Sequence, residues 1–558
     1  MAAIHLAASG LLPLLLLLLG LVVRAALNSL QLQRKLPPGP PGNLLLGNVF
    51  QIPKVRVHLK FTEWAKIYGG IYTLRIGPAT AAVITDRTLV KELLDKRSAI
   101  YSSRPRSHIG QDLITRGDHL LVMNNNDTWR LFRKTVNQHF KASMCESNHM
   151  RVVEAEHTQM MHDFLVHPER HMLHTKRAIN SIIMSLLFGI RTPSPDTQHM
   201  ADLYEIMEKW SQVMETGATP PVDVFPWLKL VPQRWLGSWV DRAMDVGRGM
   251  KRLYSSFHHK AIKARRHRHN AQSETRTFLD HVLDLQEKVG LTDNQVDFLG
   301  GVMKEGGSDT GSTMLLVMIQ ALALNPAIQE QAQAELDAVC GTDRSPTWSD
   351  FTRLPYINMI VKETMRWRPV TPLAFPHALT KDDWVHVGVG ADADADTDAG
   401  ISFFLPKGTT IFLNVWGLHH DETIHASPDR FDPSRFADAH HTHKLASDSA
   451  ASPDPSHRDH YIYGAGRRIC PGIHLSERSM FVGAAKLLWA FRFEQARDEK
   501  GSLVPIDTDP ITGYTEGFLV CPKPFRCRVV PRSGTHAETI RREFERAERE
   551  VLGGFAVP

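Results

Sequence analysis

A glycine-rich segment around a single cysteine carries the clearest chemistry in this sequence. Residues 463–472 read Tyr-Gly-Ala-Gly-Arg-Arg-Ile-Cys-Pro-Gly. The three glycines allow the backbone to turn tightly and to approach a flat ligand. The flanking arginines and backbone amides favour the thiolate of Cys470, a strong and soft ligand for iron, and Arg468 is able to pair with a carboxylate of such a ligand. A cysteine after a turn can be purely structural, but the full spacing favours a metal ligand.

Residues 305–310, Glu-Gly-Gly-Ser-Asp-Thr, form a second motif inside a long stretch of helical pattern. Each glycine in a helix interior costs about 1 kcal/mol relative to alanine. Two adjacent glycines, Gly306 and Gly307, therefore need a reason, such as room for dioxygen above a bound iron. Asp309 and Thr310 are then an acid and an alcohol that can deliver protons. A flexible kink in a core helix is the alternative interpretation.

Two arginine motifs with helical spacing accompany these segments. Glu363 and Arg366 are three residues apart, which places them on one helix face where they can form an ion pair. Trp129 and Arg133 are four residues apart and also share a face. Each motif alone is weak evidence for a functional site, because pairs at these spacings are common on helix surfaces.

Taken together, these motifs resemble those of the cytochrome P450 family, and they occur in the family's order along the chain. The resemblance covers about residues 36–533. Tyr463 stands where the family has phenylalanine, a change that should preserve the packing beside the sulfur. The remaining positions of the family signature F-x-x-G-x-R-x-C-x-G are met by Gly466, Arg468, Cys470 and Gly472.

The resemblance implies a role for each motif. Cys470 would be the axial ligand of haem b, iron protoporphyrin IX, and Asp309 with Thr310 would relay protons to bound oxygen. The family often has a second Thr or Ser after this threonine, and here Gly311 stands there, so the local water network is expected to differ. The residues that the resemblance assigns to cofactor binding are Trp129, Arg133, Gly306, Gly307, His377, Tyr463, Arg468 and Cys470.

The resemblance also adds a third member to the pair of Glu363 and Arg366. The family has an arginine in a downstream P-E-R-F segment. Residues 433–436, Pro-Ser-Arg-Phe, fit that place and make Arg435 the third member, whereas residues 428–431, Pro-Asp-Arg-Phe, fit the preceding element better. This network is expected to be structural and not catalytic.

The elements that must position these residues are mainly helical. Short alternating runs at residues 71–76 and 82–85 predict strands, and most of residues 87–350 has the pattern of amphipathic helices. With the resemblance, we expect a mainly α fold with a small β-rich lobe, the cytochrome P450 fold, preceded by one transmembrane helix.

Two of the predicted helices have clear end signals. Thr292 and Gln295 form a capping box where the glycine-containing helix begins, and an Asn-Pro pair ending at Pro326 stops it. Pro355 lies just before the helix that holds the Glu/Arg pair, and Pro369 ends it.

The N-terminus is predicted to be a membrane anchor. Residues 4–23 are almost wholly apolar, and about 20 helical residues span a bilayer core. A cleaved signal peptide is the alternative, but no Lys or Arg precedes the run, whereas Arg24, Arg34 and Lys35 follow it. The positive-inside rule then places the rest of the chain in the cytosol. With the resemblance to microsomal members, we expect a single-pass protein of the endoplasmic reticulum membrane.

The chain is therefore divided into four parts: a transmembrane anchor (1–26), a basic and proline-rich hinge (27–42), a haem-thiolate monooxygenase domain (43–533) and a C-terminal extension (534–558) predicted to be a surface helix. Two segments look inserted. Residues 391–396 are low-complexity and predict a disordered loop. Residues 437–460 contain several histidines that could chelate a metal, but a solvated loop is the preferred interpretation.

Composition limits the alternatives. The net charge of +5 over 558 residues is mildly basic and predicts no nucleic-acid partner. The five cysteines include no CxxC pair, which argues against a disulfide scaffold or a zinc ribbon.

The resemblance implies a monooxygenase that uses O2 and electrons from NADPH. The sequence has no G-x-G-x-x-G after a strand and no length for a flavin module, so NADPH–cytochrome P450 reductase is expected as a separate partner, with cytochrome b5 as an optional second donor. A haem-thiolate isomerase or dehydratase is the main alternative, and a haem-binding scaffold protein is a second. Asp309 and Thr310 argue against both, because neither needs a proton relay.

The regions that line the pocket in the family are apolar here, which suits a small hydrophobic substrate, expected to be aromatic. Residues 210–227 are predicted to form a lid. Since the chain resembles fungal secondary-metabolism members, we expect hydroxylation of a secondary-metabolite intermediate, with fatty-acid or steroid hydroxylation as the alternative. The expected pocket residues are Phe298, Val302, Val370, Leu373, Phe375 and Phe518, with Trp210, Met214, Phe225 and Trp227 in the lid.

Overall fold

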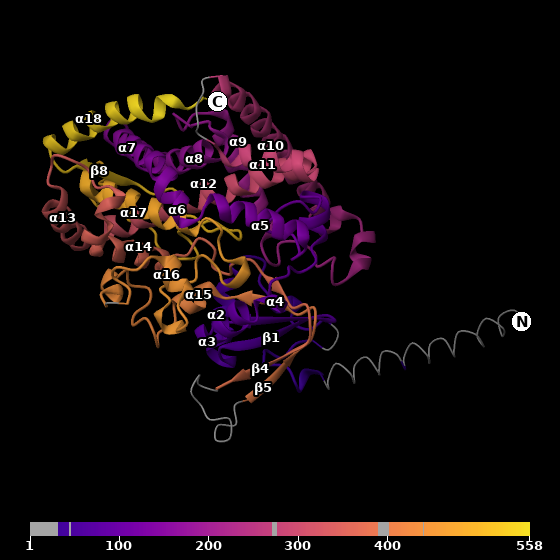
Figure 1. Cartoon of the computed structure of the whole chain (residues 1–558). Coiled ribbons are helices and arrows are strands. Elements are labelled where there is room, and N and C mark those ends of the chain that lie inside the picture. Colours follow the sequence, from indigo (N-terminus) through magenta and orange to yellow (C-terminus); the bar gives the residue numbers. More distant parts are fainter. Residues whose placement is uncertain are drawn as a thin grey trace, which may run out of the picture.

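The computed structural model describes residues 20, 32–43, 46–270, 276–388, 401–438 and 440–557. Helices fill the larger part of the molecule, and most of the strands lie together at one end of it (Figure 1). The predicted anchor, apart from Gly20, and the predicted loop at 391–396 lie outside the described residues. The mainly α fold with a small β-rich lobe is confirmed for the rest.

The bounds of the α-helices and strands follow in chain order. The helices are α2 (Val57–Tyr68), α3 (Arg87–Leu89), α4 (Ser98–Tyr101), α5 (Asp127–His139), α6 (Ala142–Met144), α7 (Met150–Val166), α8 (His171–Phe188), α9 (Gln198–Met214), α10 (Trp239–Asn270), α11 (Phe278–Val289), α12 (Asp293–Leu324), α13 (Pro326–Cys340), α14 (Pro355–Trp367), α15 (Val415–His419), α16 (Ala446–Ala451), α17 (Ile473–Ala490) and α18 (Gly534–Glu550). The strands are β1 (Ile71–Ile76), β2 (Ala79–Ile84), β3 (His377–Ala378), β4 (Asp383–Val387), β5 (Ile401–Leu405), β6 (Thr410–Leu413), β7 (Phe491–Gln495) and β8 (Cys527–Pro531).

Helix α12 lies at the centre of the helical part and packs along α8 (Figure 1). It begins as predicted, because the Thr292 hydroxyl accepts a hydrogen bond from the amide of Gln295 and the Gln295 side chain accepts one from the amide of Thr292. It ends at Leu324, and Pro326 begins α13 after a sharp turn. The long helix that carries the second motif therefore has both ends fixed by local sequence.

The close packing of α12 on α8 depends on glycines of α12. A Cβ atom on Gly307 would lie 2.6 Å from the Ile183 side chain, and one on Gly311 would lie 3.3 Å from the Ile179 side chain. The first distance is shorter than any normal contact, so a side chain at residue 307 would require the Ile183 side chain to move. Gly307 thus allows Ile183 to pack directly on the α12 backbone.

The largest sheet has four strands in the order β1-β2-β6-β3. β1 pairs with β2 antiparallel, β2 with β6 parallel, and β6 with β3 antiparallel. The strand predicted at 71–76 is confirmed, and the second strand runs from Ala79 to Ile84. His377 lies on β3 opposite Ile411, so this sheet positions one of the predicted cofactor-binding residues.

Within the described ranges, no single helix is long and apolar enough to cross a membrane. Only the pair α12 and α13, which meet at 108°, reaches the required length and hydropathy together.

The C-terminal helix α18 packs on α7. Ser533 caps its N-terminus by accepting a hydrogen bond from the amide of His536. Ile540 is fully buried, and the Phe544 ring stacks on His162 of α7 at 4.1 Å between centroids. The apolar stripe of this segment thus covers the helical part of the domain.

The expectation of a solvated loop at residues 437–460 is wrong for its second half. Residues 446–451 form α16, and Asp459 and His460 are buried. Asp459 is buried because it pairs with a charge on α14: the ammonium group of Lys362 is also buried and lies 2.9 Å from the Asp459 carboxylate. Among the described His, Cys, Asp and Glu residues, no group is arranged to hold a metal ion.

Candidate active site

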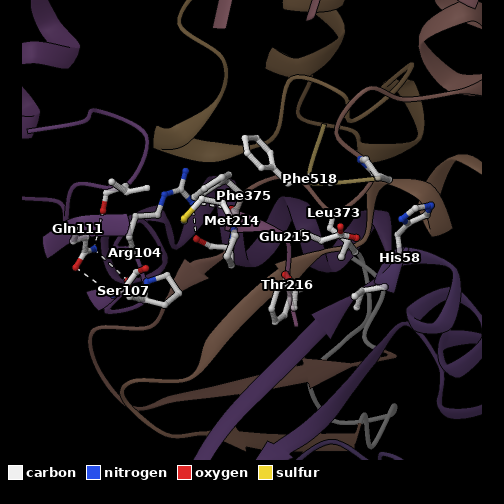
Figure 2. Close-up of a pocket in the computed structure, with 18 residues that line it drawn as sticks. His58, Arg104, Ser107, Gln111, Met214, Glu215, Thr216, Leu373, Phe375 and Phe518 are labelled. Atoms are coloured by element: carbon white, nitrogen blue, oxygen red, sulfur yellow. Dashed lines mark hydrogen bonds between the residues drawn. The ribbon is translucent and has the colours of Figure 1, made fainter. Parts of the chain in front are cut away.

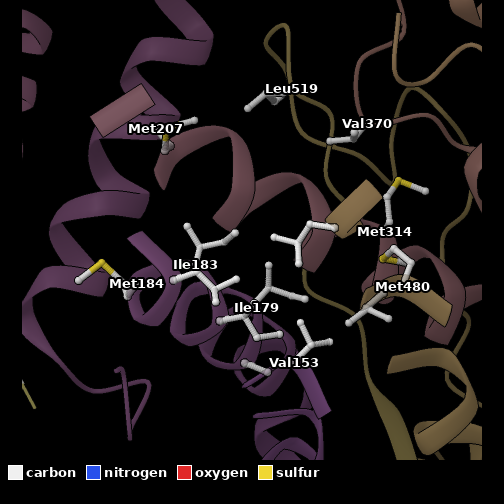
Figure 3. Close-up of a cluster of buried hydrophobic side chains, with 14 of the residues drawn as sticks. Val153, Ile179, Ile183, Met184, Met207, Met314, Val370, Met480 and Leu519 are labelled. Carbon is white, nitrogen blue, oxygen red and sulfur yellow. The ribbon is translucent and has the colours of Figure 1, made fainter. Parts of the chain in front are cut away.

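A cavity with a volume of ≈ 320 Å³ lies between α8, α12 and the cysteine segment. Its walls are largely aliphatic: Ile179 and Ile183 of α8, Met314 of α12 and Met480 of α17 surround it (Figure 3). Cys470 lines the same cavity. One apolar space therefore has a cysteine on its wall.

The backbone around Cys470 turns as tightly as the glycine pattern predicted. The Cys470 amide donates a hydrogen bond to the Tyr463 carbonyl oxygen, 2.8 Å away. Gly466 has a φ of +62°, and a Cβ atom there would lie 1.9 Å from the carbonyl oxygen of Leu94. The Tyr463 hydroxyl donates to the hydroxyl of Ser476 at 3.0 Å. Only glycine fits at residue 466, and the loop is held in one shape.

The charge around the sulfur differs from the sequence interpretation. Burial raises the pKa of the Cys470 thiol above its usual value, while the Gly472 amide and Arg133 act in the opposite direction. The arginine that acts on the sulfur is thus Arg133 of α5, and Arg468, next to the cysteine in sequence, is held by backbone carbonyls instead. A metal ion that binds the sulfur replaces this proton.

Four basic side chains gather at one edge of the cavity: Arg104, Arg133, His377 and Arg468. Burial, together with repulsion from Arg104 and Arg133, lowers the pKa of Arg468 to about 8. Burial also lowers the pKa of Arg104 to about 9 and that of His377 to about 3. Within the described part of the chain, no carboxylate pairs with any of the three arginines. The edge is therefore a site for an anionic ligand.

Backbone carbonyls and one ring hold these groups in place. The Nε of Arg468 donates to the carbonyl of Ser102 at 2.8 Å, and its guanidinium lies 4.0 Å from the ring centroid of Trp129. The Nδ1 of His377 donates to the carbonyl of Tyr101 at 2.8 Å. The structure thus brings Trp129, Arg133, His377 and Arg468 together, from four segments far apart in the sequence.

Arg104 belongs to this edge, although the sequence analysis missed it. Its Nη1 donates to the carbonyls of Phe375 and Pro376, each at 2.7 Å, and its Nε donates to Leu121 at 2.8 Å. No spacing pattern marks the residue, because all these partners come from other segments.

Both glycines of the second motif line the cavity, but they differ in the space around them: Gly307 lies against Ile183, whereas Gly306 is open. A Cβ atom on Gly306 would meet nothing within 4 Å, and Gly306 lines the cavity. The hydroxyl of Thr310, one turn later, also lines the cavity and donates to the Gly306 carbonyl at 2.7 Å. Asp309 does not line the cavity: burial raises the pKa of its carboxyl, and Lys176 opposes that shift. Helical geometry explains the difference, since adjacent residues point about 100° apart.

Glu363, Arg366 and Arg435 meet away from the cavity. Both Glu363 and Arg366 are fully buried, with 2.7 Å between the Glu363 carboxylate and the Nε of Arg366. The Nε of Arg435 lies 3.4 Å from the same carboxylate. Residues 428–431, which resemble the third-member segment in letters, supply backbone carbonyls to Arg366. The three side chains form one buried ion network.

Four of the six expected pocket residues line the cavity, namely Val302, Val370, Phe375 and Phe518, and so does Trp210 of the predicted lid. Phe298 does not, which makes that expectation wrong. Its ring packs edge-on against Tyr254 of α10, at 5.3 Å between centroids, because α10 covers that part of α12.

A second cavity of ≈ 140 Å³ adjoins the first (Figure 2). Leu373 and Met214 line this smaller space, and Phe375 and Phe518 line both. The segment predicted as a lid is continuous helix only to Met214. After it come turns and two short 3-10 helices, Pro226–Leu230 and Gln233–Leu236.

The sequence analysis also missed a polar pair in the cavity wall. His119 and Glu305 both line the cavity, and their Nε2 and Oε2 atoms are 3.1 Å apart. Glu305 directly precedes Gly306, so a helical wheel of α12 would have placed it near the cavity. His119 has no comparable sequence signal.

A metal-binding sulfur, an edge for anionic groups and an open glycine face, all on one apolar cavity, define a site for a flat, anionic metal complex. The chain belongs to the cytochrome P450 family, whose model matches residues 37–525. It is 72% identical to cytochrome P450 monooxygenase yanC of Aspergillus niger over 100% of both chains, and 71% identical to cytochrome P450 monooxygenase macC of Penicillium terrestre over 97% of this chain and 98% of that one. Cytochrome P450 monooxygenase patH of Penicillium expansum is 50% identical over 97% of this chain and 99% of its own.

The chain is therefore a cytochrome P450 monooxygenase, an oxidoreductase that inserts oxygen, and the family cofactor is haem held by a thiolate. The residues present fit that group. The cavity offers one described cysteine, Cys470, which could hold the iron, and guanidinium groups without a carboxylate partner, such as those of Arg104 and Arg468, which could hold the two propionates.

Proposed function

We propose that this protein hydroxylates a small hydrophobic, aromatic intermediate of secondary metabolism, using O2 and electrons that originate from NADPH. The observation that carries the proposal is that Cys470 and Gly306 line the same apolar cavity, with Thr310 beside the glycine. The sulfur and the open helix face leave space between them for a flat cofactor and for the reacting part of a substrate.

In this proposal, haem b is held by the chain's own residues in two ways. The Cys470 sulfur would hold the iron, and Trp129, Arg133, His377 and Arg468, joined by Arg104, would hold the propionates. Bound haem supplies the activation of O2, and thiolate ligation favours cleavage of the O–O bond. Thr310 holds a hydroxyl proton beside the Gly306 carbonyl and can pass it into the cavity.

Asp309 has a supporting role in the proposed proton supply. Its carboxyl is buried away from the cavity and next to Lys176, so it cannot donate directly. It is suited to pass protons from the α8 side of α12 toward Thr310 through water. This arrangement favours a monooxygenase over an isomerase or dehydratase, which needs no such supply.

The cavity supports the aromatic substrate class. Three of the rings that line it contact one another in a row: Trp210 packs edge-on against Phe518 at 6.2 Å between centroids, and Phe518 packs edge-on against Phe375 at 5.4 Å. Rings arranged in this way offer both faces and edges to a flat aromatic molecule.

We also propose that residues 1–26 anchor the protein in the endoplasmic reticulum membrane with the catalytic domain on the cytosolic side. The hydropathy of residues 4–23 supports this. So does the segment after α9, in which Trp227 is 59%, Leu230 87% and Trp235 70% exposed. Exposed tryptophans and leucines of this kind suit a lipid interface.

The proposed electron donors are NADPH–cytochrome P450 reductase and, as a second donor, cytochrome b5. The family implies a redox partner, and both proposed donors are membrane proteins, which agrees with the proposed location.

The test uses the full-length protein in membranes with the reductase. The reduced, CO-bound form should show the Soret band typical of thiolate ligation. Titration with small phenols, steroids and fatty acids should change the haem spin state with small aromatics at the lowest concentration, and turnover with NADPH should give a hydroxylated product. Tight binding of steroids or fatty acids alone would contradict the proposed substrate class.

A further inference from the structure

Glu305 lines the cavity, and one oxygen of its carboxyl group has no hydrogen-bond partner. The side chain is 4% exposed, and its Oε2 lies 3.1 Å from the Nε2 of His119. Its Oε1 is buried and has no hydrogen-bond partner. Among the described residues that line the cavity, it is the only buried side-chain nitrogen or oxygen atom in that condition. An unsatisfied buried acceptor is costly unless a ligand satisfies it.

Hydrogen bonds to His119 fix which group donates in this pair. The Nδ1 of His119 accepts from the amide of Leu121 at 3.3 Å, so this nitrogen carries no proton. The proton of a neutral ring is then on Nε2, and Nε2 donates it to the Oε2 of Glu305. The Oε1 of Glu305 is left as an acceptor without a partner, on a residue that lines the cavity.

The surroundings of Glu305 are aromatic. The His119 ring lies 5.5 Å from Trp210 and 6.3 Å from Phe298, measured between centroids, and Trp210 also lines the cavity. Glu305 precedes Thr310 by five residues, about 7.5 Å along the helix axis. A hydroxyl group held by Glu305 and a carbon atom near Thr310 would therefore be separated by about the length of one small aromatic molecule.

We propose that Glu305 is a specificity-determining residue whose Oε1 accepts a hydrogen bond from a hydroxyl group of the substrate. The substrate class is then a neutral hydroxylated aromatic, and aromatic carboxylates are excluded because their charge faces the same carboxyl group. This rests on the proposed function, since it concerns the substrate of the same cavity. His119 is a positioning residue, because it holds Oε2 and so directs Oε1.

The experiment measures equilibrium binding to the full-length holoenzyme from the Soret spectrum. The probes are 4-ethylphenol, its methyl ether 4-ethylanisole, and 4-ethylbenzoate, which differ at one end only. The wild type should bind the phenol at least about 10-fold more tightly than the ether, as expected for a hydrogen bond to a charged group, and the benzoate should bind weakest. Equal affinity for phenol and ether in the wild type would overturn the proposal without any variant.

Glu305→Gln is the matched variant. Because His119 donates, the amide oxygen should turn to His119 and the NH2 group should face the cavity. The acceptor is then replaced by a donor, so the preference for the phenol over the ether should vanish and the benzoate should bind more tightly than in the wild type. A phenol-to-ether ratio unchanged from the wild type would overturn the proposal.

Asp297→Asn is the control. It makes the same chemical change in a buried carboxyl of α12, but Asp297 pairs with Lys251 and His258 and does not line the cavity. Its phenol-to-ether ratio should equal that of the wild type. If none of the aromatic probes binds although the CO-bound spectrum shows thiolate ligation, the proposed substrate class fails and this proposal fails with it. If the probes bind without discrimination, this proposal alone fails.

Discussion

The hydroxyl of Thr310 donates a hydrogen bond to the carbonyl oxygen of Gly306, 2.7 Å away, at the place where α12 has no side chain facing the cavity. The hydrogen bond keeps the hydroxyl next to the open space that the glycine leaves. The same bond satisfies the hydroxyl until a ligand arrives. The Thr310 hydroxyl is thus a proton-bearing group that lies directly beside the open space at Gly306.

We expect Thr310→Ala to bind haem and substrate normally but to release reduced oxygen as hydrogen peroxide. Product formed per NADPH should fall by about 100-fold, the lower end of the usual contribution of a positioned proton donor. The measurement compares NADPH use, peroxide and product. Thr310→Ser should restore most of the coupling. Ser308→Ala should leave the coupling unchanged, because Ser308 does not line the cavity and its hydroxyl bonds to Asn180 of α8. Normal coupling in Thr310→Ala would disprove the role of Thr310 as a proton donor.

Cys470→Ala should abolish the CO-bound Soret band of thiolate ligation together with all turnover, because no other described cysteine lines the cavity. The reduced CO spectrum and the pyridine haemochrome content measure the two effects separately. Cys527→Ala, which removes a cysteine of β8, should keep the wild-type spectrum. A thiolate band in Cys470→Ala would contradict the assignment of Cys470 as the iron ligand.

Glu363→Ala and Arg366→Ala should each prevent stable haem incorporation. Both side chains are fully buried, and removing one leaves the other buried charge without its closest partner, at a cost of up to about 3–5 kcal/mol. The check is haem content per protein, together with thermal unfolding. Glu63→Ala breaks a pair of the same spacing, Lys60–Glu63, whose Glu63 side chain is 63% exposed. It should cost less than about 1 kcal/mol.

Two features that the sequence analysis predicted and the structure shows depend on local backbone geometry. The tight turn at Gly466 and the capping box at Thr292 are both set within a few residues, so their spacing alone predicts them. Arg104 and His119 were missed because every contact that places them at the cavity comes from another segment. Phe298 was misplaced because sequence periodicity shows an apolar face but not which helix covers it.

Deleting residues 1–35 should release much of the protein from membranes while haem binding survives. The domain that binds haem is held by its own core, and the described contacts of residues 32–35 with it are few, such as the Lys35 carbonyl accepting from the amide of Phe404. Membrane fractionation and the CO spectrum of the soluble fraction test this. A truncated protein that fails to fold would show that the N-terminal run is more than an anchor.

Buried histidines should make the fold sensitive to acid, and His139 is the clearest case. Burial, with added repulsion from His149 and His281, lowers its pKa from 6.5 to about 3. The Leu186 backbone opposes this shift only in part, and the rings of Phe140 and Phe278 pack against the imidazole. Between pH 6.5 and about 3 the unfolded chain binds a proton here that the folded chain does not. The stability is therefore complete above pH 6.5 and falls as the pH decreases, by up to about 1.36 kcal/mol per pH unit.

His139→Leu should remove this contribution. The leucine fills an apolar site without a titrating group, so the loss of stability between pH 7 and pH 5 should be smaller than in the wild type by up to one proton's effect. Urea midpoints of the holoenzyme at the two pH values measure the difference. His259→Leu is the control, because His259 is exposed on α10, and its pH dependence should equal that of the wild type. If His139→Leu loses as much stability in acid as the wild type, protonation of His139 does not cause the loss of stability. Other buried histidines then cause it, such as His460, whose pKa burial lowers to about 3.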